Sequence, residues 1–147
     1  MRKELLQLLG ELATLSENHG YSWHDDYVRQ TIAAFEKNPN DGWQHLLSAH
    51  FWGGAGSICD VPFSADEPKW HRENGRTPPK YLNTLDEDGY RRDNTRYMEL
   101  LSAISDAIPN KYESDEQFAR WFERAKRIGA IYDTWLADPK NAKIMRL

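Results

Sequence analysis

The residues with the most specific spacing in this chain lie between Gly53 and Asp60, where three glycines within four positions precede a serine, a cysteine and an aspartate. Glycine reaches positive φ without a Cβ clash, so this segment predicts a sharp turn or a close backbone approach. A serine or cysteine beside a histidine can act as a nucleophile, and cysteine, histidine and aspartate can ligate a metal. One interpretation is a small hydrolase or metal-dependent enzyme in which Ser57, Cys59 and Asp60 converge with a histidine in one pocket.

The spacing of the polar residues around this turn matches no established catalytic or metal-binding motif. The turn lacks the Gly-Lys-Ser/Thr ending of a nucleotide loop, and His45 and His50 lie five positions apart, which separates them in direction on a helix. His24, Asp25 and Asp26 fall in the predicted first turn of a helix, where the macrodipole favours carboxylates. We therefore predict no catalytic residue, no metal and no cofactor, and we favour a non-enzymatic role.

Binding is the role that these residues favour. A glycine turn can present backbone N–H groups to a ligand or partner, or it can serve only to pack a helix against the following loop. Two tryptophans lie in or beside segments without regular periodicity, and tryptophans at such positions are typical interface anchors. The predicted binding residues are Asp25, Asp26, Trp52, Ser57, Asp60 and Trp70.

The charge balance narrows the class of partner. The chain has 147 residues, 19 Lys and Arg against 23 Asp and Glu, and a formal net charge of −4. Residues 1–74 contain 6 basic and 11 acidic residues, and residues 75–147 contain 13 and 12, so the acidic excess lies in the amino-terminal half. Negative charge disfavours binding to nucleic acid phosphates and anionic membranes, and it favours a basic protein partner.

Cysteine use and hydropathy predict a soluble, cytoplasmic protein. Cys59 is the only cysteine, so the sequence allows no internal disulfide, which suits a reducing compartment. The first leucines are interrupted by Gln7, Gly10 and Glu11, which is unlike a signal-peptide core. No apolar run has the length of a membrane span.

Apolar periodicity predicts three helices before the glycine turn. Leucines at three- and four-residue spacing indicate a first helix that ends near Asn18. Ser22 begins a near-match to a capping box, which predicts a second helix that ends at Asn38. Asp41 can cap a third helix through Phe51, which ends where the glycines begin.

The remaining sequence predicts a long connection followed by two further helices. Residues 61–89 contain four prolines and no sustained period, which is typical of an irregular loop. A fourth helix is predicted from Tyr90, and a fifth begins at the capping box of Ser114 and Gln117. We expect the tail, 138–147, to fray. The whole chain is thus predicted to be one all-α domain of about five helices.

One segment resembles a protein family. From Trp43 to Asp60 an amphipathic stretch leads into an aromatic-Gly-Gly-x-Gly-Ser-x-x-Asp block, which is similar to small uncharacterised bacterial proteins with an aromatic-Gly-Gly-x-Gly-Ser-x-Asn-Asp block. Cys59 stands where that block has asparagine. Such proteins resemble, among others, immunity proteins of contact-dependent toxin systems. The resemblance implies a soluble helical protein without catalytic residues that binds and neutralises a cognate toxin domain.

The composition is compatible with this implication. An acidic helical protein with loop aromatics can occlude a basic toxin domain, and complementary charge speeds the association. A structural or regulatory interaction protein remains a third interpretation, and the sequence names neither the partner nor the oligomeric state. In the immunity interpretation the contact surface is the loop around Trp70 with the acidic faces of the first three helices, which contain Asp25, Asp26, Glu36 and Asp41.

Overall fold

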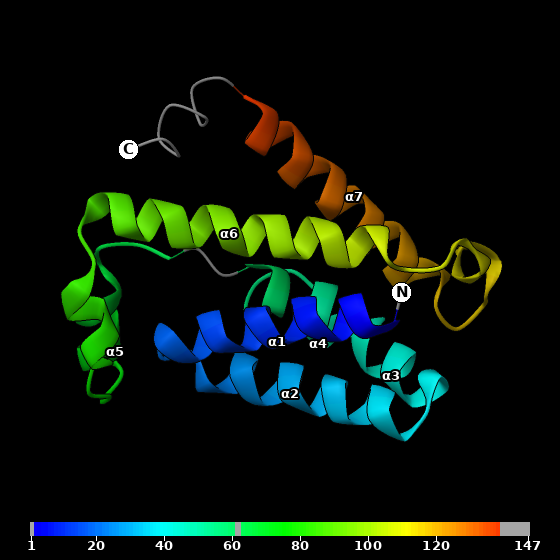
Figure 1. Ribbon diagram of the computed structural model, residues 1–147, viewed down its shortest axis with the longest axis horizontal. Coiled ribbons are helices and arrows are strands. Elements are labelled where there is room, and N and C mark those ends of the chain that lie inside the picture. The colour runs from blue at the N-terminus through cyan, green and yellow to red at the C-terminus, as the bar shows by residue number, and fades with distance from the viewer. Residues whose placement is uncertain (1, 61–62, 139–147) are drawn as a thin grey trace.

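The computed structural model describes residues 2–60 and 63–138, which form helices joined by turns and contain no strand (Figure 1). The prediction of an all-α fold is confirmed, whereas the count of about five helices is not matched. In the described part of the chain, five α-helices have eight residues or more and two are shorter, and there are three 3₁₀ segments besides. The tail predicted to fray lies outside the described residues from 139 on. In chain order the elements are α1 (Arg2–Asn18), α2 (Ser22–Lys37), α3 (Pro39–Leu46), α4 (Ala49–Trp52), η1 (Ile58–Asp60), α5 (Glu67–Glu73), η2 (Lys80–Thr84), α6 (Glu87–Asp106), η3 (Asn110–Ser114) and α7 (Ala119–Ala137).

The predicted third helix, from Asp41 to Phe51, is divided into α3 and α4 in the structure. Asn38 is the N-cap of α3, because its side-chain oxygen accepts a hydrogen bond from the Asp41 N–H at 2.9 Å. Pro39 follows in the first turn, where a missing N–H costs no helical hydrogen bond. The helix therefore begins two residues before the predicted cap.

The break between α3 and α4 has a cause in side-chain hydrogen bonding. A continuous helix would use the carbonyl of His45 to accept the N–H of the residue four positions on. Instead this carbonyl accepts hydrogen bonds from the hydroxyls of Tyr27 at 2.7 Å and Ser48 at 2.8 Å. Ser48 is extended, and the chain turns there before α4 begins.

The segment predicted as a long irregular loop, 61–89, contains helical elements in its described part. Pro68 lies in the first turn of α5, and Pro79 is the N-cap of η2. Proline suits such positions because its φ is already fixed and its missing N–H has no partner to lose there. Pro68 and Pro79 therefore begin helical elements, and α6 begins at Glu87, before the predicted Tyr90.

Two predicted capping boxes are absent from the structure. Tyr21 rather than Ser22 is the N-cap of α2, and no side chain caps this helix end. Ser114 ends η3 instead of opening the last helix. The N–H of Gln117 donates to the carboxylate of Asp115 at 2.8 Å, so a local aspartate turn precedes α7.

Four long helices are stacked in the order α2, α1, α6, α7 (Figure 1). The predicted leucine stripe of α1 is buried between α2 and α6 at Leu5, Leu9 and Leu12. The last two helices approach closely where Gly129 lies against Ser105, since a Cβ at Gly129 would lie 2.7 Å from the Ser105 hydroxyl oxygen. A larger residue there would push α7 away from α6.

Trp52 lies in the core and not at the surface where a contact residue is needed. Its side chain is fully buried, together with those of Phe51, Phe35 and Tyr97. Burying an apolar side chain of this size contributes about 1.5 to 3 kcal/mol. The carbonyl of Trp52 accepts a hydrogen bond from Arg124 Nε at 2.6 Å, so α7 also holds the end of α4. The prediction of Trp52 as an exposed loop tryptophan does not fit this placement.

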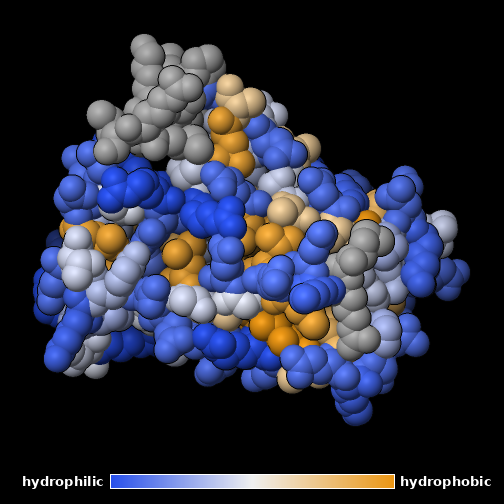
Figure 2. Space-filling model, viewed as in Figure 1, coloured by the Kyte–Doolittle hydropathy of each residue, from blue (hydrophilic) through white to orange (hydrophobic). Residues whose placement is uncertain are grey.

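The surface is mostly polar, with apolar groups in grooves along α1. Figure 2 shows them between α1 and the helices on either side. Leu6 and Ile32 line a shallow groove together with Lys3, Gln7 and Glu36. None of the described helices has both the length and the apolar composition needed to cross a bilayer.

Candidate functional site

The glycine turn uses its polar side chains to hold its own shape. Gly54 and Gly56 have φ values of +103° and +81°, which side chains with a Cβ rarely adopt. The Ser57 hydroxyl donates to the Gly54 carbonyl at 2.6 Å and accepts from the Gly54 N–H at 3.2 Å. The Asp60 carboxylate accepts the Gly56 N–H at 3.2 Å. The two residues expected to serve an enzyme therefore stabilise the turn.

Cys59 and the nearest histidine do not form a nucleophile and base pair. Burial raises the pKa of the Cys59 thiol, and its sulfur lies 3.2 Å from the Ser57 hydroxyl oxygen. His24 Nε2 donates to the Ser57 carbonyl at 3.3 Å and so faces neither the hydroxyl nor the thiol. A protonated thiol without an adjacent base is a weak nucleophile. The geometry gives the enzyme interpretation no support.

Side chains from α6 and α7 hold the turn from the core side. The hydroxyl of Tyr97 donates to the Ile58 carbonyl at 2.5 Å, and that of Tyr132 donates to the Cys59 carbonyl at 2.5 Å. Because a glycine-rich segment has high conformational entropy when unfolded, such contacts are needed to order it. The turn thus forms a rigid support beside the start of α2.

The start of α2 is where most of the predicted binding residues meet. On one side, His24 is hydrogen-bonded to Ser57 of the glycine turn. On the other side, the ring of Tyr21 lies 5.6 Å from that of Trp70 on α5. Asp25 follows His24 in the first turn of the same helix. The structure therefore gathers residues from α2, the glycine turn and α5, but leaves Trp52 in the core.

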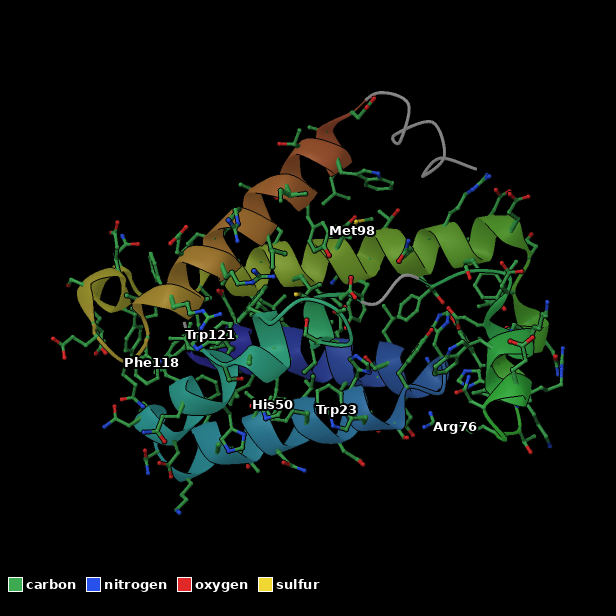
Figure 3. All side chains as sticks on the ribbon, turned by 180° about the vertical axis from the view of Figure 1, so that it is seen from behind. Trp23, His50, Arg76, Met98, Phe118 and Trp121 are labelled. Carbon is green, nitrogen blue, oxygen red and sulfur yellow. The ribbon has the colours of Figure 1, made fainter. Side chains whose placement is uncertain are left out.

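A continuous row of rings crosses this region, and we call it the aromatic ridge. Consecutive ring centroids along it are separated by 5.0 to 5.8 Å. Figure 3 shows two of its members, Trp23 on α2 and His50 on α4, next to each other. Ring pairs at such distances stabilise one another and hold each other in place. In order, the aromatic ridge consists of Trp70, Tyr21, His24, Trp23, Tyr27 and His50.

Two tryptophans of the aromatic ridge are exposed to solvent. The exposed fraction is 46% for Trp23 and 40% for Trp70, so Trp70 is placed at the surface as the binding prediction needs. Sequence reasoning missed Trp23, although the sequence contained a signal for it. Val28 and Phe35 define the buried face of α2, and Trp23 is out of register with them.

The predicted carboxylates near the aromatic ridge differ in availability. Asp25 is mostly buried and pairs with Arg29 Nε at 2.6 Å, and Arg29 also pairs with Glu17 at 2.9 Å. Asp26 is exposed and has no ion pair with any residue that the structure describes. Asp60 is exposed as well, with one carboxylate oxygen on the Gly56 N–H. Asp26 is thus the carboxylate most available to a partner.

No family model matches this chain, and no curated protein or solved structure matches it either. The resemblance of Trp43–Asp60 to immunity proteins therefore stays a prediction. The contacts of the aromatic ridge and the charges beside it are the observations from which a function can be inferred.

A second cluster, which sequence reasoning missed, lies in the interior beside the aromatic ridge. His19 is fully buried at the end of α1, with Nδ1 2.7 Å from a Glu67 oxygen and Nε2 2.7 Å from an Asp93 oxygen. Both ring nitrogens face carboxylates, so both carry protons in a charged imidazolium. Burial opposes this charge, but the hydrogen bonds to Asp93 and Glu67 outweigh it and raise the pKa of His19.

Neighbouring groups complete this cluster, which we call the His19 network: His19, Glu67, Asp93, Tyr81 and His71. The Tyr81 hydroxyl donates to Asp93 at 2.6 Å, and His71 Nε2 donates to the His19 carbonyl at 2.8 Å. Hydrogen bonds to His19 and Tyr81 outweigh burial and lower the pKa of Asp93. Within the described residues no group of three or more such side chains is arranged to hold a metal.

The His19 network connects α1 to α5, η2 and α6. His19 also stacks on Phe63 with the ring centroids 3.7 Å apart and the rings nearly parallel. Because His19 has no exposed surface, a substrate cannot reach it. The network positions α5 instead, and α5 contains Trp70 of the aromatic ridge.

Proposed function

We propose that this protein is a non-enzymatic, protein-binding module of the immunity type, which binds and neutralises a basic toxin domain. The observation that carries the proposal is the aromatic ridge, where Trp23 and Trp70 are exposed and where Asp26, three residues after Trp23, has no ion pair with the described residues. Tryptophan is enriched among the few residues that dominate protein interfaces. Large exposed aromatic side chains on a polar surface commonly mark an interaction site.

The neighbouring structure favours a rigid binding surface. The glycine turn supports one side of the aromatic ridge through His24 and Ser57, and the His19 network fixes α5 on the other side. A surface that is ordered before binding loses less conformational entropy when the partner arrives. Both supports therefore favour tight association without a large rearrangement.

The charge distribution favours a basic partner. The aromatic ridge lies within the half of the chain that has 11 acidic against 6 basic residues. Complementary charge raises the association rate and disfavours acidic competitors. Inhibition then follows from occlusion, because a bound protein covers the basic surface of the toxin domain.

A capture experiment with matched variants tests the proposal. The purified chain serves as bait in a lysate of its native host, and retained proteins are identified by mass spectrometry. We expect one basic protein, retained stoichiometrically, weakened by salt and by Asp26→Lys. Glu123→Lys on α7 is the matched control, because it changes the net charge equally at another exposed carboxylate and leaves retention unchanged.

A growth assay then tests neutralisation. The retained protein is expressed alone and together with the chain. We expect growth arrest by the retained protein alone, relief by the unaltered chain, and loss of relief with Asp26→Lys. Equal effects of Asp26→Lys and Glu123→Lys, or retention of no basic protein, would contradict the proposal.

A further inference from the structure

We propose that Trp23 and Asp26 form a receptor for one arginine side chain of the partner, with the guanidinium on the indole and its N–H groups on the carboxylate. This inference rests on the proposed function, since it specifies what a basic partner presents to the aromatic ridge. It adds a contact residue, Trp23, and a chemical group on the partner.

The first argument comes from the other tryptophans of this chain. The guanidinium carbon of Arg76 lies 5.8 Å from the ring centroid of Trp70, and that of Arg120 lies 4.8 Å from that of Trp121. Trp23 is more exposed than Trp70, yet no cation from the described residues lies over it. The electron-rich indole face attracts a cation within about 6 Å of its centroid. Trp23 therefore offers to a partner the contact that Trp70 makes within the chain.

The second argument is the position of Asp26. Residues three apart on a helix are neighbours on its surface, so Asp26 lies one turn from Trp23. Its carboxylate is exposed and has no ion pair with the described residues, whereas Asp25 on the same turn is already paired with Arg29. A cation on Trp23 thus finds a negative partner on the same helix.

The third argument is that Trp23 is held in place. Its ring is nearly parallel to that of Tyr27, with an interplanar angle of 13° and centroids 5.8 Å apart. The ring of His24 meets it edge-on at 5.0 Å. Burial lowers the pKa of His24, so this ring is neutral near pH 7 and does not repel an incoming cation.

Arginine fits this pair of groups better than lysine. The planar guanidinium stacks on an indole and directs several N–H donors in its own plane toward a carboxylate. An ammonium group is compact and strongly hydrated, so it gains less from a half-exposed ring. The receptor should therefore bind an arginine peptide more tightly than a lysine peptide of equal charge.

A peptide titration tests the receptor directly. The probes are capped hexaarginine, hexalysine and uncharged hexacitrulline at matched ionic strength, and the readout is the indole N–H signal of Trp23 in ¹H–¹⁵N spectra. We expect a saturable shift with hexaarginine, about threefold to tenfold weaker binding of hexalysine, and no shift with hexacitrulline. Equal binding of hexaarginine and hexalysine would overturn the assignment to arginine.

Variants separate the receptor from general attraction between charges. Asp26→Asn keeps the shape of the side chain and should weaken hexaarginine about threefold to tenfold. Trp23→Leu should remove the preference for hexaarginine over hexalysine, whereas Trp135→Leu, at an exposed tryptophan of α7, is the matched control and should keep it. An unchanged preference in Trp23→Leu would overturn the proposal.

The outcomes distinguish this inference from the function on which it rests. If hexaarginine binds at Trp23 and no basic protein is retained in the capture experiment, the receptor stands and the proposed function fails. If a basic protein is retained equally by Trp23→Leu, the proposed function stands and the receptor fails. If the Trp23 signal shifts when only the protein concentration is raised, the bound arginine belongs to a second copy of the chain. This outcome would overturn its assignment to a partner protein.

Discussion

His19 and His24 lie five residues apart, and the fold gives them opposite properties. His19 has carboxylates at 2.7 Å on both ring nitrogens, and its pKa is raised. His24 faces the Ser57 carbonyl at 3.3 Å, and its pKa is lowered by burial. Burial opposes the charged form of both rings, so the hydrogen-bond partners of each ring determine whether its pKa is raised or lowered. The comparison shows that two histidines of one short segment have different roles. His19 is charged inside the protein, whereas His24 is neutral and supports the aromatic ridge.

The His19 network and the aromatic ridge also differ in which of their side chains remain available to bind a partner. Every member of the His19 network has a hydrogen-bond partner inside the protein. The aromatic ridge keeps the exposed Trp23 and Trp70 at the surface. Substitutions in the network should therefore change stability, and substitutions on the ridge should change binding.

The largest effect is expected for removal of the imidazolium from the His19 network. His19→Ala leaves Glu67 without its buried partner, and it removes one partner of Asp93. Breaking a buried charged cluster in this way costs about 3 to 5 kcal/mol in free energy of unfolding. Denaturant titration measures the loss. His50→Ala on the aromatic ridge is the control and should cost much less, and equal losses would contradict the comparison.

A smaller effect is expected for loss of one hydroxyl in each region. Tyr81→Phe removes a hydrogen bond to the charged Asp93 and should lower the free energy of unfolding by about 1.5 to 3 kcal/mol. Tyr27→Phe removes a hydrogen bond to the neutral His45 carbonyl and should cost about 0.5 to 1.5 kcal/mol. Thermal or denaturant unfolding of both variants decides the order. A larger loss in Tyr27→Phe would reverse the proposed ranking of the two regions.

Stability should depend on pH in opposite ways at the two histidines. A raised pKa in the folded protein means that the contribution of His19 is complete below the ordinary value of 6.5 and is lost as pH rises through the raised value. A lowered pKa means that the contribution of His24 is complete above 6.5 and is lost as pH falls through the lowered value. The free energy of unfolding should therefore depend less on pH on the alkaline side of this range in His19→Gln. In His24→Gln it should depend less on pH on the acidic side. The reverse pattern would contradict both assignments.

The smallest effect on stability is expected for Asp26, the carboxylate proposed to contact the partner. Asp26→Asn removes no ion pair with a described residue, so the free energy of unfolding should change by no more than about 0.5 kcal/mol. Retention of the basic partner should nevertheless fall. Calorimetric unfolding and the capture assay on the same sample measure both quantities. A loss of stability comparable to that of Tyr81→Phe would show that Asp26 has a structural role.

Local patterns in the sequence predicted the helices better than their ends. The leucine stripe of α1 and the boundary at Asn38 follow from periodicity and capping chemistry that act over a few residues. Pro68 and Pro79 were misread because proline both interrupts helices and begins them, and the neighbouring sequence does not distinguish the two.

The candidate site depended on contacts that no local pattern contains. His19 meets Glu67 and Asp93 across 48 and 74 positions of the chain. The burial of Trp52 could not be read from the sequence for the same reason. The packing of α4 against α7 buries the Trp52 side chain. Trp23 was missed for a different reason, because its position outside the register of Val28 and Phe35 could have been read from the sequence.

The stacked ring of Phe63 and the full burial of His19 separate the Nδ1 proton, which faces Glu67 of α5, from solvent. That proton can exchange with water only when α5 moves away, because no surface of the imidazole is accessible while α5 is in place. The exchange rate of the His19 ring proton therefore reports how often this segment opens. Since α5 also contains Trp70, the same rate measures the lifetime of one end of the aromatic ridge.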